Sequence, residues 1–274
     1  MEKNTELQNL KGFRDFLPPE MKIRKYVQGV FEDVFSSYGF EPLETPSMEY
    51  AETLMGKYGE EADKLVYKFK DYGERKVALP YDLTVPTAKV LAMYQEELQL
   101  PFKRYQIQRI WRAEKPQKGR YREVLQCDID TFGINNMLAD AEIIAVIYTT
   151  LNRLGIPNFK IRINSRTALF KMLSKLEIPE KNWSASLQIL DKIDRKTDQE
   201  VQKELVKSDF SEKAAQTLIK EWKNLSPKKN DPNLTRLEEY LNDLGIPATA
   251  YQFDPTLVRG LDYYTGPIFE TKVI

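Results

Sequence analysis

Residues 104–130 read RYQIQRIWRAEKPQKGRYREVLQCDID, and this stretch decides the predicted fold. Side chains of a β-strand point alternately to its two faces. On the way out from Arg104, most even positions are polar and the odd ones include aromatic and aliphatic residues. On the way back, residues 125–130 alternate in the same manner. The pattern predicts two antiparallel strands joined by a loop at 115–122. Their shared polar face would carry Arg112, Glu114, Gln126 and Asp130.

This polar face has two interpretations. It is either the solvated outer side of an ordinary hairpin or a surface that binds a ligand. A solvated face is more often built from Lys, Thr and Ser than from this mixture of Arg, Gln and Asp. The loop KPQKGRYR at 115–122 is basic around a glycine, which suits a polyphosphate or a nucleic acid backbone. An ordinary charged hairpin tip would look the same, so both alternatives stay open here.

The composition limits the chemistry. The chain has 274 residues, with 41 Lys plus Arg balancing 41 Asp plus Glu, so any contact with RNA must be local. It contains no histidine, which removes the commonest general base and metal ligand. A single cysteine, Cys127, excludes an internal disulfide and predicts a cytoplasmic protein. No window approaches the roughly 18 apolar residues that a membrane span needs. Because histidine is absent, carboxylates, arginines and tyrosines must carry any catalysis.

Two shorter stretches also place charged groups where a ligand could bind. LPYDLTVP at 79–86 brings an acid and a hydroxyl, Asp82 and Thr84, to one face. They could hold an ammonium group, or Thr84 could simply be the N-cap of a helix, since it precedes Pro86. LVRGLDYYTG at 257–266 combines an arginine with a permissive glycine, an acid and paired tyrosines. An arginine in an otherwise apolar run needs an anion as its partner.

The rest of the chain predicts helices and strands that form one α/β core. Helices are expected at 20–38 and 138–154, a hairpin at 64–80 and a strand at 160–164. Between 165 and 250 the charge density rises and apolar residues recur at helical spacing, which predicts an all-helical insertion. The expected domains are a core at 1–164, the insertion at 165–250 and a return to the core at 251–274.

Together these stretches resemble the histidyl-tRNA synthetases, which are class II aminoacyl-tRNA synthetases. The resemblance implies an α+β fold with a mixed, mostly antiparallel sheet flanked by helices and an all-helical insertion. Residues 104–130 resemble motif 2 of that class, with its Arg-x-Glu strand, loop and returning strand. Residues 20–46 resemble motif 1, the dimer-forming helix and strand that end in a proline. LVRGLDYYTG resembles the signature of the histidine enzymes, and KGFRDFLPPE at 11–20 resembles their N-terminal opening.

The resemblance implies ATP as a substrate, with Mg²⁺ arriving in the ATP complex and no resident metal site. Arg112 would contact the α-phosphate and the substrate carboxylate. Glu114 would accept from the adenine amino group, and Arg120 would reach the phosphates or the adenine. Arg259 would lie on the α-phosphate opposite Arg112. The implied catalytic residues are Arg112 and Arg259.

The same resemblance implies a pocket for L-histidine. Asp82 and Thr84 would hold the α-ammonium, with Gln126 nearby. Asp130 and Tyr264 would hydrogen-bond the imidazole. The implied histidine-binding set is Asp82, Leu83, Thr84, Arg112, Gln126, Asp130, Arg259, Tyr263 and Tyr264. The other implied partners are tRNA(His) and a second copy of the chain, joined through motif 1.

Three departures from the family pattern matter. Pro80 stands where the family usually has an arginine, no GGRYD-like segment follows residues 269–274, and the third class motif and the anticodon-binding domain do not follow. We therefore expect a chain truncated within the catalytic domain and poorly active by itself. Two alternatives remain. One is the histidine-binding regulatory subunit of ATP phosphoribosyltransferase, and the other is a non-enzymatic binding or dimerisation fragment.

Overall fold

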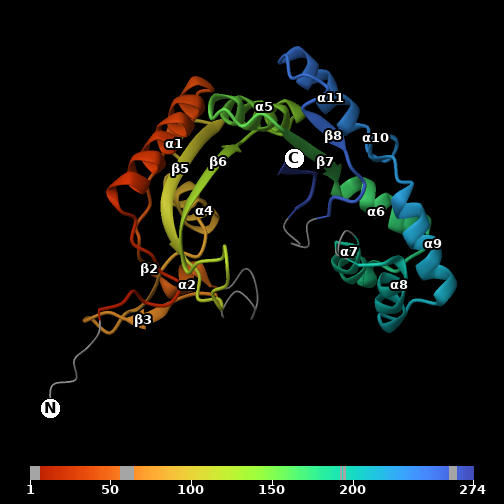
Figure 1. The fold of residues 1–274 in the computed structure, drawn as a ribbon, viewed down its shortest axis with the longest axis horizontal. Coiled ribbons are helices and arrows are strands. Elements are labelled where there is room, and N and C mark those ends of the chain that lie inside the picture. Colours follow the sequence, from red (N-terminus) through yellow and green to blue (C-terminus); the bar gives the residue numbers. More distant parts are fainter. Residues whose placement is uncertain (1–6, 56–64, 192, 194–195, 259–263) are drawn as a thin grey trace. The chain divides into compact units, whose positions relative to one another are not determined.

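A computed structural model describes residues 7–55, 65–191, 193, 196–258 and 264–274. The chain divides into two compact units, Met1–Ile134 and Asn135–Ile274. Figure 1 labels the helices and strands of both units.

The first unit begins with the long helix α1, which starts at Pro18 and ends at Ser37. Proline is well placed there, because the first turn of a helix lacks backbone acceptors for its N–H groups. Phe35 is buried and its ring lies 5.5 Å from that of Tyr105 on β5, Phe102–Trp111. This contact packs α1 along the hairpin (Figure 1).

Two three-stranded sheets complete the first unit. One has the order β1-β5-β6, with β1 parallel and β6 antiparallel to β5, and the other is the antiparallel sheet β2-β4-β3. The strands β3 and β4 form the hairpin expected at 64–80. The remaining elements of this unit are β1 Glu41–Pro42, β2 Glu49–Tyr50, α2 Ala51–Leu54, β3 Lys68–Lys70, β4 Lys76–Ala78, α4 Thr84–Met93 and β6 Glu123–Phe132.

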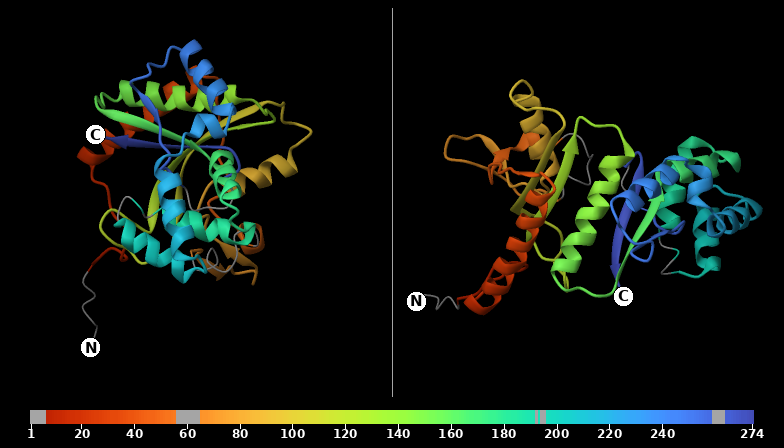
Figure 2. Two further views of the ribbon diagram at one scale, coloured as in Figure 1. Left: turned by 90° about the vertical axis from the view of Figure 1, so that its right-hand side faces the viewer. Right: turned by 90° about the horizontal axis from the view of Figure 1, so that it is seen from above.

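The second unit is built on the sheet β8-β7-β9, in which β8 runs parallel and β9 antiparallel to β7 (Figure 2). The helices α6 to α11 follow β7 and precede β8, so the whole helical stretch is inserted in the sequence between two strands of one sheet. The three-part domain division at 164 and 250 stays a prediction. The elements of this unit are α5 Met137–Arg153, β7 Phe159–Ser165, α6 Arg166–Lys175, η1 Glu180–Asn182, α7 Trp183–Leu190, α8 Asp198–Lys207, α9 Glu212–Lys223, α10 Pro227–Asn230, α11 Asn233–Asp243, β8 Tyr251–Phe253 and β9 Pro267–Val273.

A continuous apolar core holds the helical stretch together. Trp222 is completely buried among leucines and isoleucines of α6, α7, α8 and α9. Val258, which immediately precedes the undescribed residues 259–263, is buried in the same core. Burial of this apolar surface is the main stabilising contribution to such a module.

The α+β fold class and the predominance of antiparallel pairing are confirmed. Within the described ranges, no helix is both long and apolar enough to span a membrane.

Candidate functional site

The polar face of the β5–β6 hairpin points into the protein along β5. Arg104, Gln106 and Gln108 are only 0%, 1% and 9% exposed. In the register of the two strands, Gln108 lies opposite Gln126 and Arg104 lies opposite Asp130. This burial excludes a solvated outer face for the β5 half of the hairpin, because buried polar groups need partners.

Arg112 lies just beyond the end of β5, one residue later than the last strand residue. Its Nε donates to the carbonyl of Tyr81 at 3.1 Å, and its Nη2 donates to Oε1 of Gln126 at 3.2 Å. Gln126 in turn donates from Nε2 to Oδ2 of Asp128 at 2.9 Å. The guanidinium is thus fixed from two sides by neutral acceptors. Among the described residues its side-chain partners are neutral, and a cation held in this way keeps its charge available to an anionic ligand.

Asp82 introduces helix α4 and takes part in its cap. Its Oδ1 accepts from the backbone N–H of Val85 at 3.3 Å, whereas Thr84 is the first helical residue. The alternative in which Thr84 caps this helix is therefore wrong. Burial raises the pKa of Asp82, and the nearby Asp128 carboxylate adds to this, while Arg112 opposes it. Leu83 is completely buried, Thr84 is exposed, and Asp82 is half-buried.

Asp130 forms an ion pair with the buried guanidinium of Arg104. Its own side chain is 36% exposed, so the carboxylate stays accessible. Burial raises its pKa, and the Arg104 charge opposes that rise.

The basic loop between the strands is held by its own charges. Arg120 Nε lies 2.5 Å from Oε2 of Glu114, and the backbones of Gln117 and Arg120 bridge the turn. Arg122 donates from Nε to the carbonyl of Glu114 at 3.0 Å. The two residues predicted to bind the nucleotide base and phosphates, Glu114 and Arg120, are therefore paired with each other in this structure.

The N-terminal segment 11–16 packs against this loop and hydrogen-bonds to it. The backbone N–H of Arg122 donates to the carbonyl of Gly12 at 2.8 Å, and the Arg122 side chain donates to the carbonyl of Lys11 at 3.3 Å. The guanidinium of Arg14 stacks 3.3 Å from the ring centre of Tyr121. Gly12 has a φ of +92°, and a Cβ there would come within 2.9 Å of Arg122. The sequence did not assign a role to these contacts.

The segment 257–266 belongs to the second unit, and it is described only at its ends. Arg259 and Tyr263 lie outside the described residues, and Tyr264 is half-buried. Leu257 is buried, and its carbonyl accepts from Nδ2 of the completely buried Asn164 at 2.9 Å. The chain that leads into Arg259 is therefore anchored to strand β7.

Sequence reasoning missed the buried network beneath Asp130. The residues that form it are Thr45, Arg104, Gln106 and Gln108, and the signal was present in the even positions of β5. Alternation assigns those positions to one polar face, but it does not identify the hydrogen-bond partner of each side chain.

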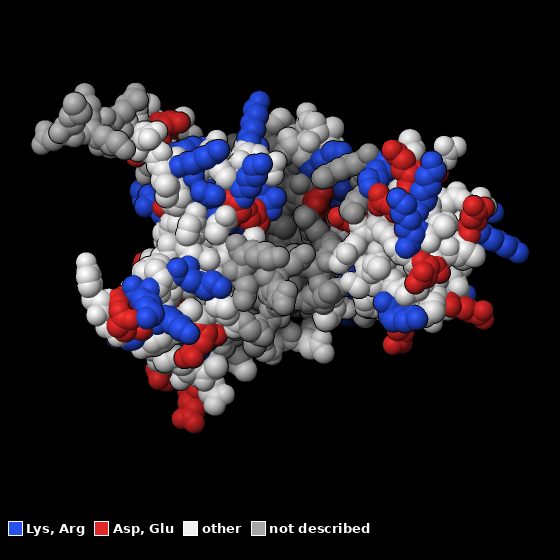
Figure 3. Space-filling view, turned by 90° about the horizontal axis from the view of Figure 1, so that it is seen from below, with Lys and Arg blue, Asp and Glu red and all other residues white. Residues whose placement is uncertain are grey.

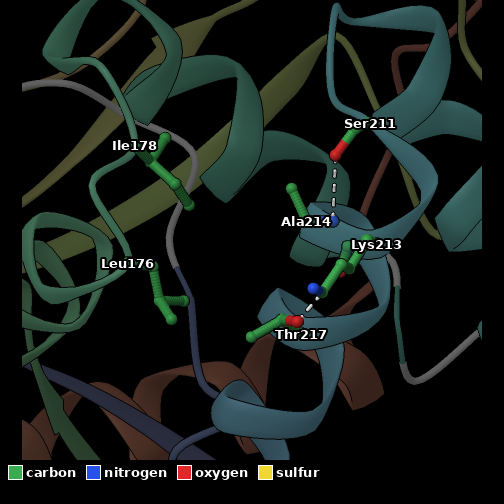
Figure 4. A pocket seen from close by; sticks show the side chains of 6 residues that line it. All are labelled: Leu176, Ile178, Ser211, Lys213, Ala214 and Thr217. Carbon is green, nitrogen blue, oxygen red and sulfur yellow. Dashed lines mark hydrogen bonds between the residues drawn. The ribbon is translucent and has the colours of Figure 1, made fainter.

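Other features of the structure involve different residues. A pocket of about 260 Å³ in the helical stretch is lined by Leu176, Ile178, Ser211, Lys213, Ala214 and Thr217 (Figure 4). Its Ser211 hydroxyl is engaged with the N–H of Ala214 at 3.2 Å. On the face drawn in Figure 3, basic and acidic side chains of the described residues are interspersed. In the described part of the chain, no group of three or more Cys, Asp or Glu is arranged to hold a metal ion.

Comparison with known proteins matches the chain to a known family. The profile described as Histidyl-tRNA synthetase matches residues 12–272. The histidine–tRNA ligase of Treponema denticola is 39% identical, over 96% of this chain and 62% of that protein. The histidine–tRNA ligase of Aeropyrum pernix is 40% identical, over 95% of this chain and 63% of that protein. The chain thus spans somewhat less than two thirds of the length of these curated relatives.

Solved structures give the same result. The histidyl-tRNA synthetase of Nostoc sp. PCC 7120 superimposes with a TM-score of 0.87 at 29% identity, over 98% of this chain and 66% of that one. A structure described as an ATP phosphoribosyltransferase regulatory subunit/histidyl-tRNA synthetase from Bacillus halodurans C reaches 0.82 at 22% identity, over 99% of this chain and 74% of that one, which supports the fold alone. On the match over residues 12–272 and the identity to curated relatives, the chain belongs to the histidyl-tRNA synthetase family.

Proposed function

We propose that this chain provides the histidine-activating site of a histidine–tRNA ligase. The observation that carries the proposal is Arg112, which Tyr81 and Gln126 fix from two sides, while the half-buried Asp82 and the partly exposed Asp130 lie near the same hairpin. A fixed cation with flanking carboxylates suits a ligand that has an ammonium group, an imidazole and a phosphate.

In the proposed reaction the histidine carboxylate attacks the α-phosphorus of ATP in line. A carboxylate–phosphorus bond forms, the bond to the bridging oxygen breaks, and pyrophosphate leaves with the electron pair. Charge increases on the non-bridging oxygens in the transition state, where Arg112 and Arg259 would stabilise it. Mg²⁺ would enter bound to the ATP phosphates as part of the substrate. No step requires a proton-transfer residue, so the lack of histidine in the chain is no obstacle.

Substrate selection would depend on Asp82, with Leu83, Thr84 and Gln126, at the α-ammonium. At the imidazole it would depend on Asp130, Tyr263 and Tyr264. A ligand without a ring N–H would leave the Asp130 carboxylate unpaired, and such sites can reject the wrong substrate by roughly 10⁴-fold or more. Glu114 and Arg120 would release each other and take the adenine and phosphates of ATP.

The complete ligase would then transfer the histidyl group to the 3′ end of tRNA(His). It would work as a cytoplasmic homodimer joined through α1 and the strand after it. Exposed Ile23 and Tyr26 on α1 support that surface, and the single cysteine suits a reducing compartment.

Histidine-dependent ATP–pyrophosphate exchange tests the proposal. It should be measured on this chain and on a polypeptide extended by the residues that the relatives carry beyond the matched region. We expect exchange in the extended form and little in the 274-residue chain. An extended form that binds histidine but exchanges no pyrophosphate would instead identify a regulatory subunit of the ATP phosphoribosyltransferase kind. One that binds neither substrate would identify a non-enzymatic fragment.

A further inference from the structure

Arg104 is a completely buried arginine to which the proposed reaction gives no role. Its side chain has no exposed surface, although it lies on the polar face of β5. A buried guanidinium is strongly unfavourable unless an anion and hydrogen-bond acceptors compensate for the lost hydration. Its position therefore depends on what lies opposite.

The compensating anion is Asp130. The two residues are direct partners in the β5–β6 register, and Arg104 Nη2 forms an ion pair with Oδ2 of Asp130. Arg104 also donates from Nη1 to Oε1 of Gln106 at 3.3 Å. The buried Arg104 thus anchors the Asp130 carboxylate from inside the protein. Because the Asp130 side chain remains 36% exposed, the carboxylate is still open to a ligand.

A buried network holds Arg104 in this position. Gln106 Nε2 donates to Oγ1 of Thr45 at 2.8 Å and to Oε1 of Gln108 at 2.6 Å. Gln108 Nε2 donates to the carbonyl of Thr45 at 2.7 Å. With both amide donors engaged in this way, Gln106 can present only its oxygen to Arg104, which fixes the orientation of the pair.

We propose that Arg104 is a positioning residue for substrate specificity, because it fixes the Asp130 carboxylate in the orientation that accepts the imidazole N–H. The inference rests on the proposed function, in which Asp130 contacts the ring. A hydrogen bond to a carboxylate weakens steeply as its angle departs from linearity. An unanchored Asp130 would rotate about its side-chain bonds, and its discrimination between rings with and without an N–H would fall.

The test compares equilibrium binding of L-histidine and of thienylalanine, whose ring has a similar shape and no N–H, to the 274-residue chain. Arg104→Met removes the charged guanidinium and keeps an unbranched apolar side chain along the path of the arginine methylene groups. The matched control is Arg109→Met, the same change in the same strand at an exposed arginine, whose Nε lies 3.7 Å from Glu123. Circular dichroism and thermal unfolding check the fold of each variant.

We expect Arg104→Met to weaken histidine binding about tenfold or more, to change thienylalanine binding less than about twofold, and Arg109→Met to leave both unchanged. If a folded Arg104→Met chain lost affinity for both ligands equally, or for neither, Arg104 would have a structural role only and the proposal would be overturned.

Arg104→Lys decides the matter if the methionine variant does not fold. It keeps the charge, but a single ammonium cannot reproduce the planar arrangement that serves Asp130 and Gln106 together. A selective loss of histidine affinity of about threefold supports the proposal, and unchanged affinity overturns it. If the unsubstituted chain binds no histidine, the proposed function fails and this inference fails with it. Wild-type binding that survives every Arg104 substitution defeats the inference alone.

Discussion

The Nη2 of Arg112 donates to Oε1 of Gln126 at 3.2 Å, which joins the residue after β5 to the returning strand β6. The contact orients the cation that the proposed reaction places on the α-phosphate. Gln126 is thus expected to act on the transition state through Arg112, besides contacting histidine directly.

Replacing Gln126 by leucine removes this acceptor and leaves Arg112 held by the Tyr81 carbonyl alone among the contacts described here. We expect kcat of pyrophosphate exchange in the extended polypeptide to fall about tenfold or more, together with a rise in the histidine KM. Cys127→Ser is the control, because Cys127 is exposed on the opposite face of the same strand. A Gln126→Leu variant with an unchanged kcat would show that Arg112 needs no orientation from β6.

Gly12→Ala should disturb the basic loop at 115–122, although Gly12 itself is not assigned to the site. The new Cβ would come within 2.9 Å of Arg122 Cγ, at a φ of +92° that non-glycine residues rarely adopt. We expect the KM for ATP to rise about threefold to tenfold, while histidine binding changes little. Gly245→Ala is a matched control, since it shares a positive φ of +71° and has no atom within 4 Å of the added Cβ. Equal effects of both changes on the KM for ATP would argue that the contact between segment 11–16 and Arg122 does not position the loop.

The sequence predicted the hairpin well because alternation records which face each side chain occupies. It predicted the polar face as a ligand surface or a solvated one, and could not choose between them. Burial at Gln106 and Gln108 depends on Thr45, about 60 residues earlier in the chain. Neither periodicity nor composition carries that long-range partner, and the same holds for the contact between Gly12 and Arg122.

The residues assigned by resemblance fall into two groups, those that the structure describes and those that it does not. Arg112, Glu114, Arg120 and Gln126 do lie together around one hairpin. The ion pair between Glu114 and Arg120 was not predicted, because the resemblance describes a site filled with ATP. Arg259 and Tyr263 lie outside the described residues, so their roles stay proposals.

Asp254→Asn should make the second unit less stable and change its response to acid. Burial favours the protonated form of Asp254, but hydrogen bonds from Arg162 and Thr256 outweigh it, so the pKa of this carboxyl lies below its usual value. Arg162 Nε donates to Oδ2 of Asp254 at 2.7 Å. A lowered pKa in the folded state means that the stabilisation is complete above about pH 4 and disappears as the pH falls through the folded-state pKa.

We therefore expect Asp254→Asn to lower the free energy of unfolding by about 1 kcal/mol at pH 7 and by much less near pH 3. Urea unfolding at the two pH values measures the difference. Asp243→Asn, at the end of α11, is a control for the loss of one charge. A deficit for Asp254→Asn that stayed constant with pH would mean that the carboxylate charge does not contribute to stability.

Arg259→Ala should separate transition-state stabilisation from substrate binding. In the proposed reaction Arg259 neutralises charge that grows on the α-phosphate only as the carboxylate attacks. We expect kcat for adenylate formation in the extended polypeptide to fall about 100-fold or more, with the dissociation constant of histidine changed less than about threefold. Equal losses in both quantities would contradict a transition-state role.

Asn164→Leu tests whether the anchor of that segment matters to the same step. The buried Asn164 amide donates to the carbonyls of Pro255 and Leu257, at 3.2 Å and 2.9 Å, just before the chain reaches Arg259. Leucine has a similar size but cannot donate, so both carbonyls lose a partner and the approach to Arg259 loosens. We expect kcat to fall about tenfold in single-turnover measurements. If Asn164→Leu slowed adenylate formation further in an Arg259→Ala background, Asn164 would act independently of Arg259; no further slowing would show that it acts through that arginine.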